Sequence, residues 1–114
     1  MHQYSESSNH VERDKYIKGA LEPMKLCKKG GLFMTEWGTS QDSGNGATDF
    51  TEATRWSDWC GEESIGMCNW ALNDKEESSN AVQPGAGFSS PTPPPELELK
   101  HLSPSGTHVL EKLI

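Results

Sequence analysis

Glu36 is the first residue of this sequence whose type and position suggest chemistry. It follows the strand-like residues LFMT at 32–35, so a carboxylate is expected where an apolar strand ends. In parallel α/β barrels the active site gathers at the carboxyl ends of the strands. A carboxylate held near an aromatic ring and a phenol can attack the anomeric carbon of a sugar. Retaining glycosidases place a second carboxyl group about 5–5.5 Å away, and Glu36 is our candidate for the first of such a pair.

The segment WALNDKEE, residues 70–77, has the composition of a sugar-binding surface. Trp70 offers a flat apolar face on which a pyranose ring can lie. The polar side chains that follow can hydrogen-bond sugar hydroxyls; they are Asn73, Asp74, Lys75 and Glu77. Taken singly, each residue also fits an ordinary structural role, Trp70 in a core and the charged run in a solvated loop.

The hydrophobic pattern predicts helices and strands in alternation. Spacings of three to four residues predict helices over residues 11–29, 50–60 and 104–113, and short apolar runs predict strands over residues 32–35 and 65–72. This order is typical of an α/β unit with a parallel sheet. Two short strands cannot make a stable parallel sheet alone, because both faces and both edges need cover. We therefore expect further strands from elsewhere.

Capping and turn residues indicate where these elements begin and end. Asp49 with Glu52 can start the second helix as a capping box, and Ser103, before a proline, suits the N-cap of the last helix. Pro23 should kink or split the first helix. The composition of residues 40–48, SQDSGNGAT, predicts a flexible loop. The apolar face of the last helix is expected from Val109, Leu110 and Leu113.

Composition narrows the classes of function. The chain has 114 residues, a formal charge of -7 and 32% hydrophobic residues. The negative charge argues against a nucleic-acid partner, whose phosphates need a basic surface. No run of about 18 apolar residues is present, so we expect no membrane span, and the polar first residues do not resemble a signal peptide.

The cysteines do not indicate a metal or redox site. The chain has Cys27, Cys60 and Cys68, too few for a disulfide-rich scaffold and at spacings that fit no usual zinc pattern. We predict no metal and no cofactor, and interpret the thiols as structural. A small oxidoreductase that uses Cys60 and Cys68 is an alternative.

Several motifs together resemble glycoside hydrolase family 5. TEWGTS at residues 35–40, NWALNDKEES at residues 69–78 and LSPSGT at residues 102–107 look like the C-terminal part of its endo-β-1,4-glucanases, the cellulases. HQY at residues 2–4 looks like the family's His-aromatic-Tyr at the end of the sixth strand. The separations between the motifs also fit the family, and the match covers most of the chain.

The resemblance implies an incomplete (β/α)8 TIM barrel. Residues 1–114 would be the C-terminal part of the catalytic domain, about strands 6–8 with their helices. A missing N-terminal segment would supply the rest of the barrel. A proline-rich loop at residues 87–100 departs from the family, since its stretch 88–95 replaces a loop that commonly bears glycine and tryptophan.

The resemblance also implies retaining hydrolysis of internal β-1,4-glucosidic bonds, in cellulose or a related β-glucan. Glu36 matches the catalytic nucleophile. Tyr4 matches the tyrosine that orients this carboxylate by a hydrogen bond, and His2 matches the histidine that supports the same cluster.

Three further residues match substrate-binding positions of the family. Trp70 matches the aromatic platform under the sugar beside the cleavage point. Lys75 and Glu77 match the pair that binds hydroxyls of the next sugar on the non-reducing side. The remaining tryptophans are interpreted as packing residues; they are Trp37, Trp56 and Trp59.

The family's general acid/base follows an asparagine, and the sequence contains no Asn-Glu pair. This group protonates the leaving oxygen and then activates water, and general acid/base catalysis typically contributes about 10²–10⁴-fold. We therefore expect the isolated chain to be inactive. The alternative is a non-catalytic remnant with at most weak carbohydrate binding.

The resemblance also implies the partners and location of the whole protein. The expected partner is a β-1,4-glucan, with cellulose, mixed-linkage glucan and mannan all open as the natural polymer. No nucleic acid or membrane is expected as a partner. Secretion is expected because family members meet polymeric glucan outside the cell.

Overall fold

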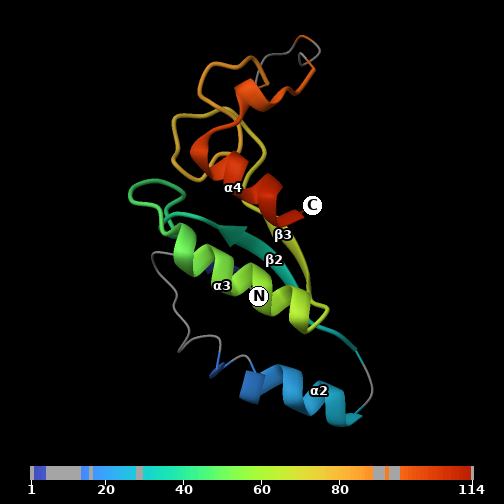
Figure 1. The fold of residues 1–114 in the computed structure, drawn as a ribbon. Helices are drawn as coiled ribbons and strands as arrows, with labels where there is room; N and C mark the ends of the chain where they lie inside the picture. Colours follow the sequence, from blue (N-terminus) through green and yellow to red (C-terminus); the bar gives the residue numbers. More distant parts are fainter. Residues whose placement is uncertain are drawn as a thin grey trace.

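The computed structural model describes residues 2–4, 14–15, 17–27, 30–88, 92 and 96–113, and for His2, Tyr4 and Cys27 it describes the backbone alone. Figure 1 shows how the elements are arranged. In chain order they are β1 (His2–Tyr4), the π-helix η1 (Ile17–Leu21), α2 (Glu22–Cys27), β2 (Phe33–Gly38), α3 (Phe50–Glu62), β3 (Gly66–Asn69), the 3-10 helix η2 (Leu99–His101) and α4 (Pro104–Leu113).

The described strands form one parallel sheet in the order β1-β2-β3. β1 pairs with β2 so that His2 lies beside Glu36. β2 pairs with β3 so that Trp37 lies beside Asn69. The predicted parallel arrangement is confirmed for these strands. Their carboxyl ends therefore meet at one edge of the sheet, which is where the candidate residues lie.

The predicted strands have different ends in the structure. β2 continues past Thr35 to Gly38, because its last residues pair with β1. Glu36 therefore lies within the strand, and the prediction that it follows the strand is wrong. β3 spans Gly66–Asn69 only, so the prediction of a strand over residues 65–72 is too long at both ends.

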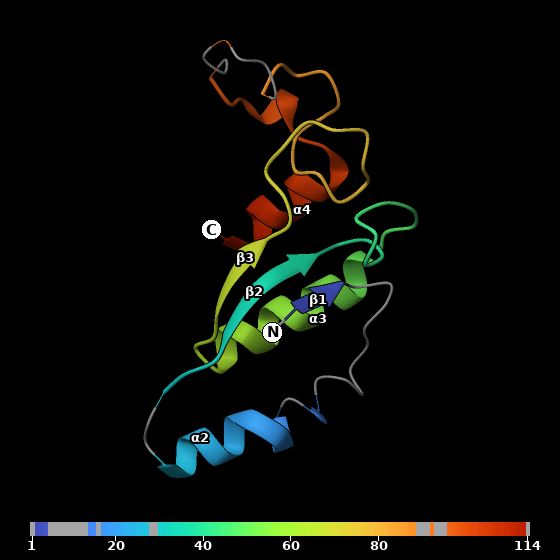
Figure 2. The same ribbon diagram turned by 180° about the vertical axis from the view of Figure 1, so that it is seen from behind.

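α3 covers one face of the sheet and forms the core with it (Figures 1 and 2). Trp56 and Trp59 of α3 meet edge to face, with ring centroids 5.7 Å apart. Together with Trp37 of β2 they are at most 5% exposed, which confirms that all three are packing residues. The buried members of the cluster are Leu21, Met34, Trp37, Ala53, Trp56, Trp59, Cys60, Ile65 and Val109.

None of the described helices covers the opposite face of the sheet (Figure 2). Phe33 is 49% exposed and Trp70 is 42% exposed, and Cys68 on β3 is exposed as well. Large apolar side chains on a parallel sheet are usually covered. The described residues thus form one sheet, its helical layer on one side and an uncovered face on the other.

α3 begins where its capping residue predicts. The Asp49 side chain accepts a hydrogen bond from the backbone N–H of Glu52 at 2.8 Å. In a capping box the Glu52 side chain would in turn accept from the N–H of Asp49. Here that N–H donates to the carbonyl of Thr39 at 2.9 Å, and the Glu52 carboxylate pairs with Arg55 at 3.1 Å. The helix continues to Glu62, slightly beyond the predicted end.

The first predicted helix is divided ahead of Pro23. The wider turn of η1 ends at Leu21, and regular α-helix begins at Glu22. A proline has no N–H to donate to the preceding turn, so a change of helix type next to it is expected. Residues 11–13, 16 and 28–29 of that prediction lie outside the described residues.

An arm of the chain between β3 and α4 projects beyond α4 (Figure 1). A backbone bridge between Val82 and Leu102 closes its base, and the N–H of Gln83 donates to the carbonyl of His101 at 2.8 Å. The short helix η2 lies in this arm, so the end of the predicted proline-rich loop, residues 87–100, is helical. Residues 89–91 and 93–95 of the loop lie outside the described residues.

α4 starts at the predicted cap but buries different side chains from those predicted. The Ser103 hydroxyl accepts from the N–H of Gly106 at 3.0 Å, as an N-cap does. Val109 is buried, but Leu113 is 61% exposed, so the predicted apolar face is partly wrong. The helix instead approaches the loop after β3 through the small residues Ser105 and Gly106. No helix in the described part of the chain is both long and apolar enough to cross a membrane.

We predict that Gly106→Ala destabilises the chain by about 1–3 kcal/mol, the usual cost of overpacking. A Cβ atom at this position would lie 1.8 Å from the backbone oxygen of Ala81, which cannot move aside as a flexible side chain can. Urea unfolding checks this. The matched control is Gly61→Ala in α3, where nothing lies within 4 Å and helix propensity alone should raise stability slightly. Equal effects of the two changes would contradict the explanation.

We also predict that folding stability falls as the pH drops below about 6.5, the ordinary histidine pKa. Burial, and then the charge of Lys112, lower the pKa of His108, whose ring packs 5.0 Å from that of Phe50. Because the folded-state pKa is depressed, the unfolded chain binds the proton more readily. The stabilisation is complete above pH 6.5 and is lost as the pH falls toward the folded-state pKa.

A comparison of melting temperatures between pH 5 and pH 8 measures this dependence. His108→Gln should have a flatter pH profile than the unchanged chain, because it removes the group that titrates. If both profiles have the same slope, another ionisable group is responsible.

Candidate active site

Glu36 lies on the open face of the sheet, near the carboxyl end of β2. Met34 and Trp37 both point into the core although they are three residues apart, and the register between β2 and β3 shifts between them. Regular alternation would have placed residues 34 and 36 on the same face. Thr35 is exposed and Glu36 is half-buried. Because successive strand residues point to opposite faces and Trp37 points into the core, Glu36 belongs to the face opposite α3.

β1 brings residues 2–4 alongside Glu36. His2 pairs directly with Glu36, and Tyr4 pairs with Gly38. Gln3 between them is 1% exposed. The side chains of His2 and Tyr4 lie outside the described part, so the hydrogen bond from Tyr4 to Glu36 stays a prediction.

Trp70 lies at the same edge, one residue beyond β3. Its backbone N–H donates to the carbonyl of Trp37 at 2.8 Å, and the Asn69 side chain donates to the same carbonyl at 3.2 Å. The peptide bond between Trp70 and Ala71 is cis. With 42% of its surface exposed, Trp70 is not a core residue, unlike the other tryptophans. Trp70 and Glu36 thus lie at the carboxyl ends of neighbouring strands.

A turn in the loop after β2 brings Glu77 close to Trp70. A Cβ atom built on Gly44 would lie 3.5 Å from Oε2 of Glu77 and 3.7 Å from Nε1 of Trp70. Gly44 has φ +80°, a backbone conformation that favours glycine. Its carbonyl accepts from both the N–H and the hydroxyl of Ser79, at 3.1 and 2.6 Å. The loop predicted to be flexible is therefore held against residues 70–79, and Gly44 is the sequence signal for this turn.

Lys75 and Asp74 differ in what they can offer a ligand. Lys75 is exposed, and its backbone N–H donates to Oδ1 of Asn73 at 3.2 Å. Asp74 is only 8% exposed, and its Oδ2 accepts from the N–H groups of Gly87 and Phe88 at 2.9 Å. The prediction that Asp74 bonds sugar hydroxyls is therefore wrong, since this carboxylate fixes the base of the arm. The assignment of Lys75 to sugar binding stays a prediction.

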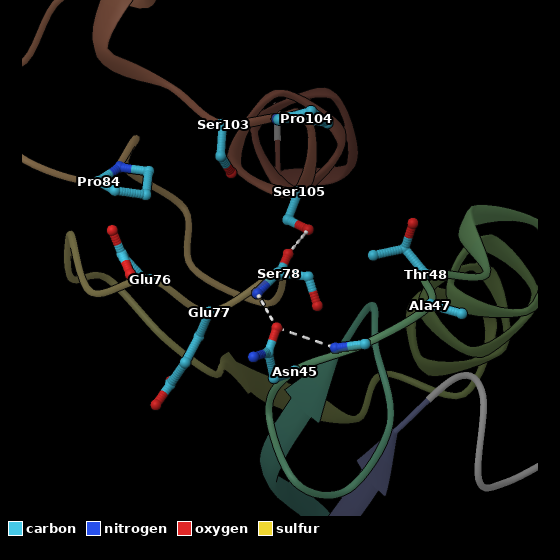
Figure 3. Close-up of a pocket in the computed structure, with 11 residues that line it drawn as sticks. Asn45, Ala47, Thr48, Glu76, Glu77, Ser78, Pro84, Ser103, Pro104 and Ser105 are labelled. Atoms are coloured by element: carbon cyan, nitrogen blue, oxygen red, sulfur yellow. Dashed lines mark hydrogen bonds between the residues drawn. The ribbon is translucent and has the colours of Figure 1, made fainter.

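A cavity of about 600 Å³ lies behind this segment, between the loop after β2 and the start of α4. Figure 3 shows that the side chains of Glu76 and Glu77 leave the segment on different sides, while Ser78 is held by Asn45 and Ser105. Among the predicted site residues whose side chains the structure describes, Glu77 lines the cavity, and Glu36, Trp70 and Lys75 are not part of its lining.

The described residues give no support to metal or thiol chemistry. Within the described ranges, no group of three or more His, Cys, Asp or Glu side chains is placed to hold a metal ion. Cys60 is buried, and burial raises the pKa of its thiol to about 11, which disfavours the reactive thiolate. Cys68 is exposed on the open face of β3, so the two thiols do not form one site.

Comparison with known proteins identifies the family. Residues 1–76 match the model of the cellulase family, glycosyl hydrolase family 5. The chain is 39% identical over 88 residues to endoglucanase A of Evansella cellulosilytica, and 38% identical over 82 residues to endoglucanase N of Pectobacterium atrosepticum. These matches cover 77% and 72% of this chain but 17% of each relative.

Solved structures of similar proteins match almost the entire chain. A structure from Cytophaga hutchinsonii superposes with a TM-score of 0.80 at 30% identity, covering 99% of this chain and 33% of that one. The catalytic domain of a Thermobifida fusca endoglucanase in complex with cellotetraose gives 0.75 at 32% identity, with the same coverage. The chain therefore spans about a third of the length of these structures, and it belongs to the cellulases of glycosyl hydrolase family 5.

Proposed function

We propose that this chain forms the nucleophile side of the active site of a retaining endo-β-1,4-glucanase. On this proposal β1, β2 and β3 correspond to the sixth, seventh and eighth strands of a (β/α)8 barrel, of which residues 1–114 are the C-terminal part. The observation that carries the proposal is that Glu36 on β2 and Trp70 directly after β3 lie at the same edge of a parallel sheet, at the carboxyl ends of neighbouring strands. The family membership of the chain supports it.

In the proposed reaction, the Glu36 carboxylate attacks the anomeric carbon of a glucose unit. The bond to the leaving oxygen breaks, and a covalent glycosyl ester forms on Glu36 until water hydrolyses it. His2 lies beside Glu36 in the register of β1, and Tyr4 lies two residues further along the same strand. We propose that these two residues keep the carboxylate ionised and oriented.

The substrate would lie along the open face, with one glucose unit on Trp70. Glu77 lies close to this indole, and Lys75 precedes it on the same exposed segment, so both can bond hydroxyls of the next unit. Cellotetraose bound to the Thermobifida fusca relative supports a β-1,4-glucan as the substrate. We further propose that the whole protein acts outside the cell, where such polymers occur.

The general acid/base is not among these residues. A natural glucoside has a poor leaving group, which needs a proton from this acid. We therefore expect the isolated chain to hydrolyse cellulose poorly, while its nucleophile and its sugar-binding surface are already arranged. Cleavage of soluble cellulose by the purified chain that disappears in Glu36→Gln would overturn this expectation.

The nucleophile can be tested without the acid by using an activated sugar. We predict that 2,4-dinitrophenyl 2-deoxy-2-fluoro-β-cellobioside labels Glu36 in the isolated chain, because dinitrophenolate leaves without protonation and the fluorine slows release of the ester. Mass spectrometry of peptides should place the added sugar on Glu36. The label should be lost in Glu36→Gln and kept in the control Glu62→Gln on the exposed surface of α3. Labelling at another carboxylate would refute the assignment.

We also predict that Trp70→Ala weakens cellotetraose binding roughly tenfold, about 1.4 kcal/mol, because the sugar loses an apolar surface on which to lie. Isothermal titration calorimetry measures the change. The matched control is Phe33→Ala, which removes a similarly exposed ring at the opposite end of β2. Equal losses from both changes would mean that sugar binds the open face without a preferred position.

A further inference from the structure

Ser105, near the start of α4, is hydrogen-bonded both to the residue after β2 and to the loop after β3, the two segments next to the candidate active site. Its hydroxyl oxygen lies 2.7 Å from Oγ1 of Thr39. The same oxygen lies 2.5 Å from the carbonyl oxygen of Ser78, a bond that Figure 3 shows. Thr39 directly follows β2, the strand that carries Glu36, and Ser78 directly follows Glu77. Ser105 is 1% exposed and Thr39 is fully buried, so water cannot easily replace either partner.

The chemistry of these groups determines the direction of both hydrogen bonds. A carbonyl oxygen can only accept, so the single hydroxyl hydrogen of Ser105 is donated to Ser78. Thr39 must therefore donate its own hydrogen to Ser105. This pair of bonds connects the end of β2 to the loop after β3 through one buried side chain. Losing a partner leaves buried polar atoms unsatisfied, which costs more than the net value of an exposed bond.

A displacement of Ser78 would change the positions of Glu77 and Trp70 through a few contacts. Its neighbour Ser79 is bonded twice to the carbonyl of Gly44. Gly44 in turn lies against the carboxylate of Glu77 and the indole nitrogen of Trp70. The bond from Ser105 therefore holds the segment on which both residues depend.

We infer that Ser105 is a positioning residue that sets the separation between the β2 end carrying Glu36 and the loop carrying Trp70 and Glu77. The inference rests on the proposed function, because that separation matters only if one sugar chain contacts all of these residues. Ser105 acts through Thr39 and Ser78 and does not itself contact the sugar.

The inference is tested first without any sugar. The four tryptophans of the chain are replaced by 5-fluorotryptophan, which yields one fluorine NMR signal each, and Trp70→Phe identifies the signal of Trp70. Ser105→Ala should shift or broaden the Trp70 signal. The matched control is Ser57→Ala, because Ser57 is also buried, at 5% exposed, and donates to the carbonyl of Thr54 within α3. This control should leave the Trp70 signal in place.

A second pair of variants keeps the test valid if Ser105→Ala fails to fold. Thr39→Val retains the shape of the side chain but removes the hydrogen that Ser105 accepts, so it should reproduce the change at Trp70. Thr39→Ser keeps the hydroxyl and should restore the original spectrum. An unchanged Trp70 signal in both Ser105→Ala and Thr39→Val would overturn the inference. An equal change in Ser57→Ala would overturn it too, since general loosening would then explain the effect.

Titration with cellotetraose separates this inference from the proposed function. At a temperature well below the melting transition of every variant, Ser105→Ala and Thr39→Val should weaken binding at least about threefold, and Ser57→Ala should leave it unchanged. If the unchanged chain itself shows no response of Trp70 to cellotetraose, the proposed function fails. The ligand-free spectra would still decide whether Ser105 positions the loop.

Discussion

The burial of Trp37 against α3 is the constraint on which the rest of the structure depends. Its indole is fully buried, so it sets which face of β2 turns toward the helical layer. Its carbonyl accepts from the side chain of Asn69 and the backbone of Trp70, so it also sets how β3 lies along β2. Because Trp37 both packs in the core and pairs with β3, Glu36 beside it and Trp70 bonded to its carbonyl reach the same edge of the sheet.

Polar contacts through small residues position the loops above this edge. The loop after β2 and the loop after β3 meet at Gly44, where φ is +80° and a Cβ atom would be in contact distance of Glu77 and Trp70. α4 closes against the second loop so tightly that Gly106 has no room for a Cβ atom next to Ala81. Apolar packing tolerates small shifts, whereas a hydrogen bond between buried groups has a narrow range of distance and angle. This arrangement suits segments that must hold side chains for a ligand.

Sequence reasoning could predict much of this fold, because periodicity and capping are local. The start of α3 at Asp49 and the parallel order of the strands were predicted correctly. The end of β2 was not, since it depends on pairing with residues 2–4, which are far away in the sequence. Composition could not separate Asp74 from Lys75 either. The structural role of Asp74 is visible only in the fold, where the backbone N–H groups of Gly87 and Phe88 donate to its carboxylate.

On the proposed function, the work of the active site is divided between this chain and the rest of the barrel. The backbone N–H of Trp70 donates to the carbonyl of Trp37, and the loops after β2 and β3 meet at Gly44, so contacts within this part of the chain position the proposed nucleophile side. Protonation of the leaving oxygen requires a carboxyl group on the other side of the scissile bond, and we assign that role to none of the described carboxylates. We therefore expect this chain alone to react with glucosides whose leaving group needs no proton, whereas hydrolysis of natural glucosides requires the complete barrel.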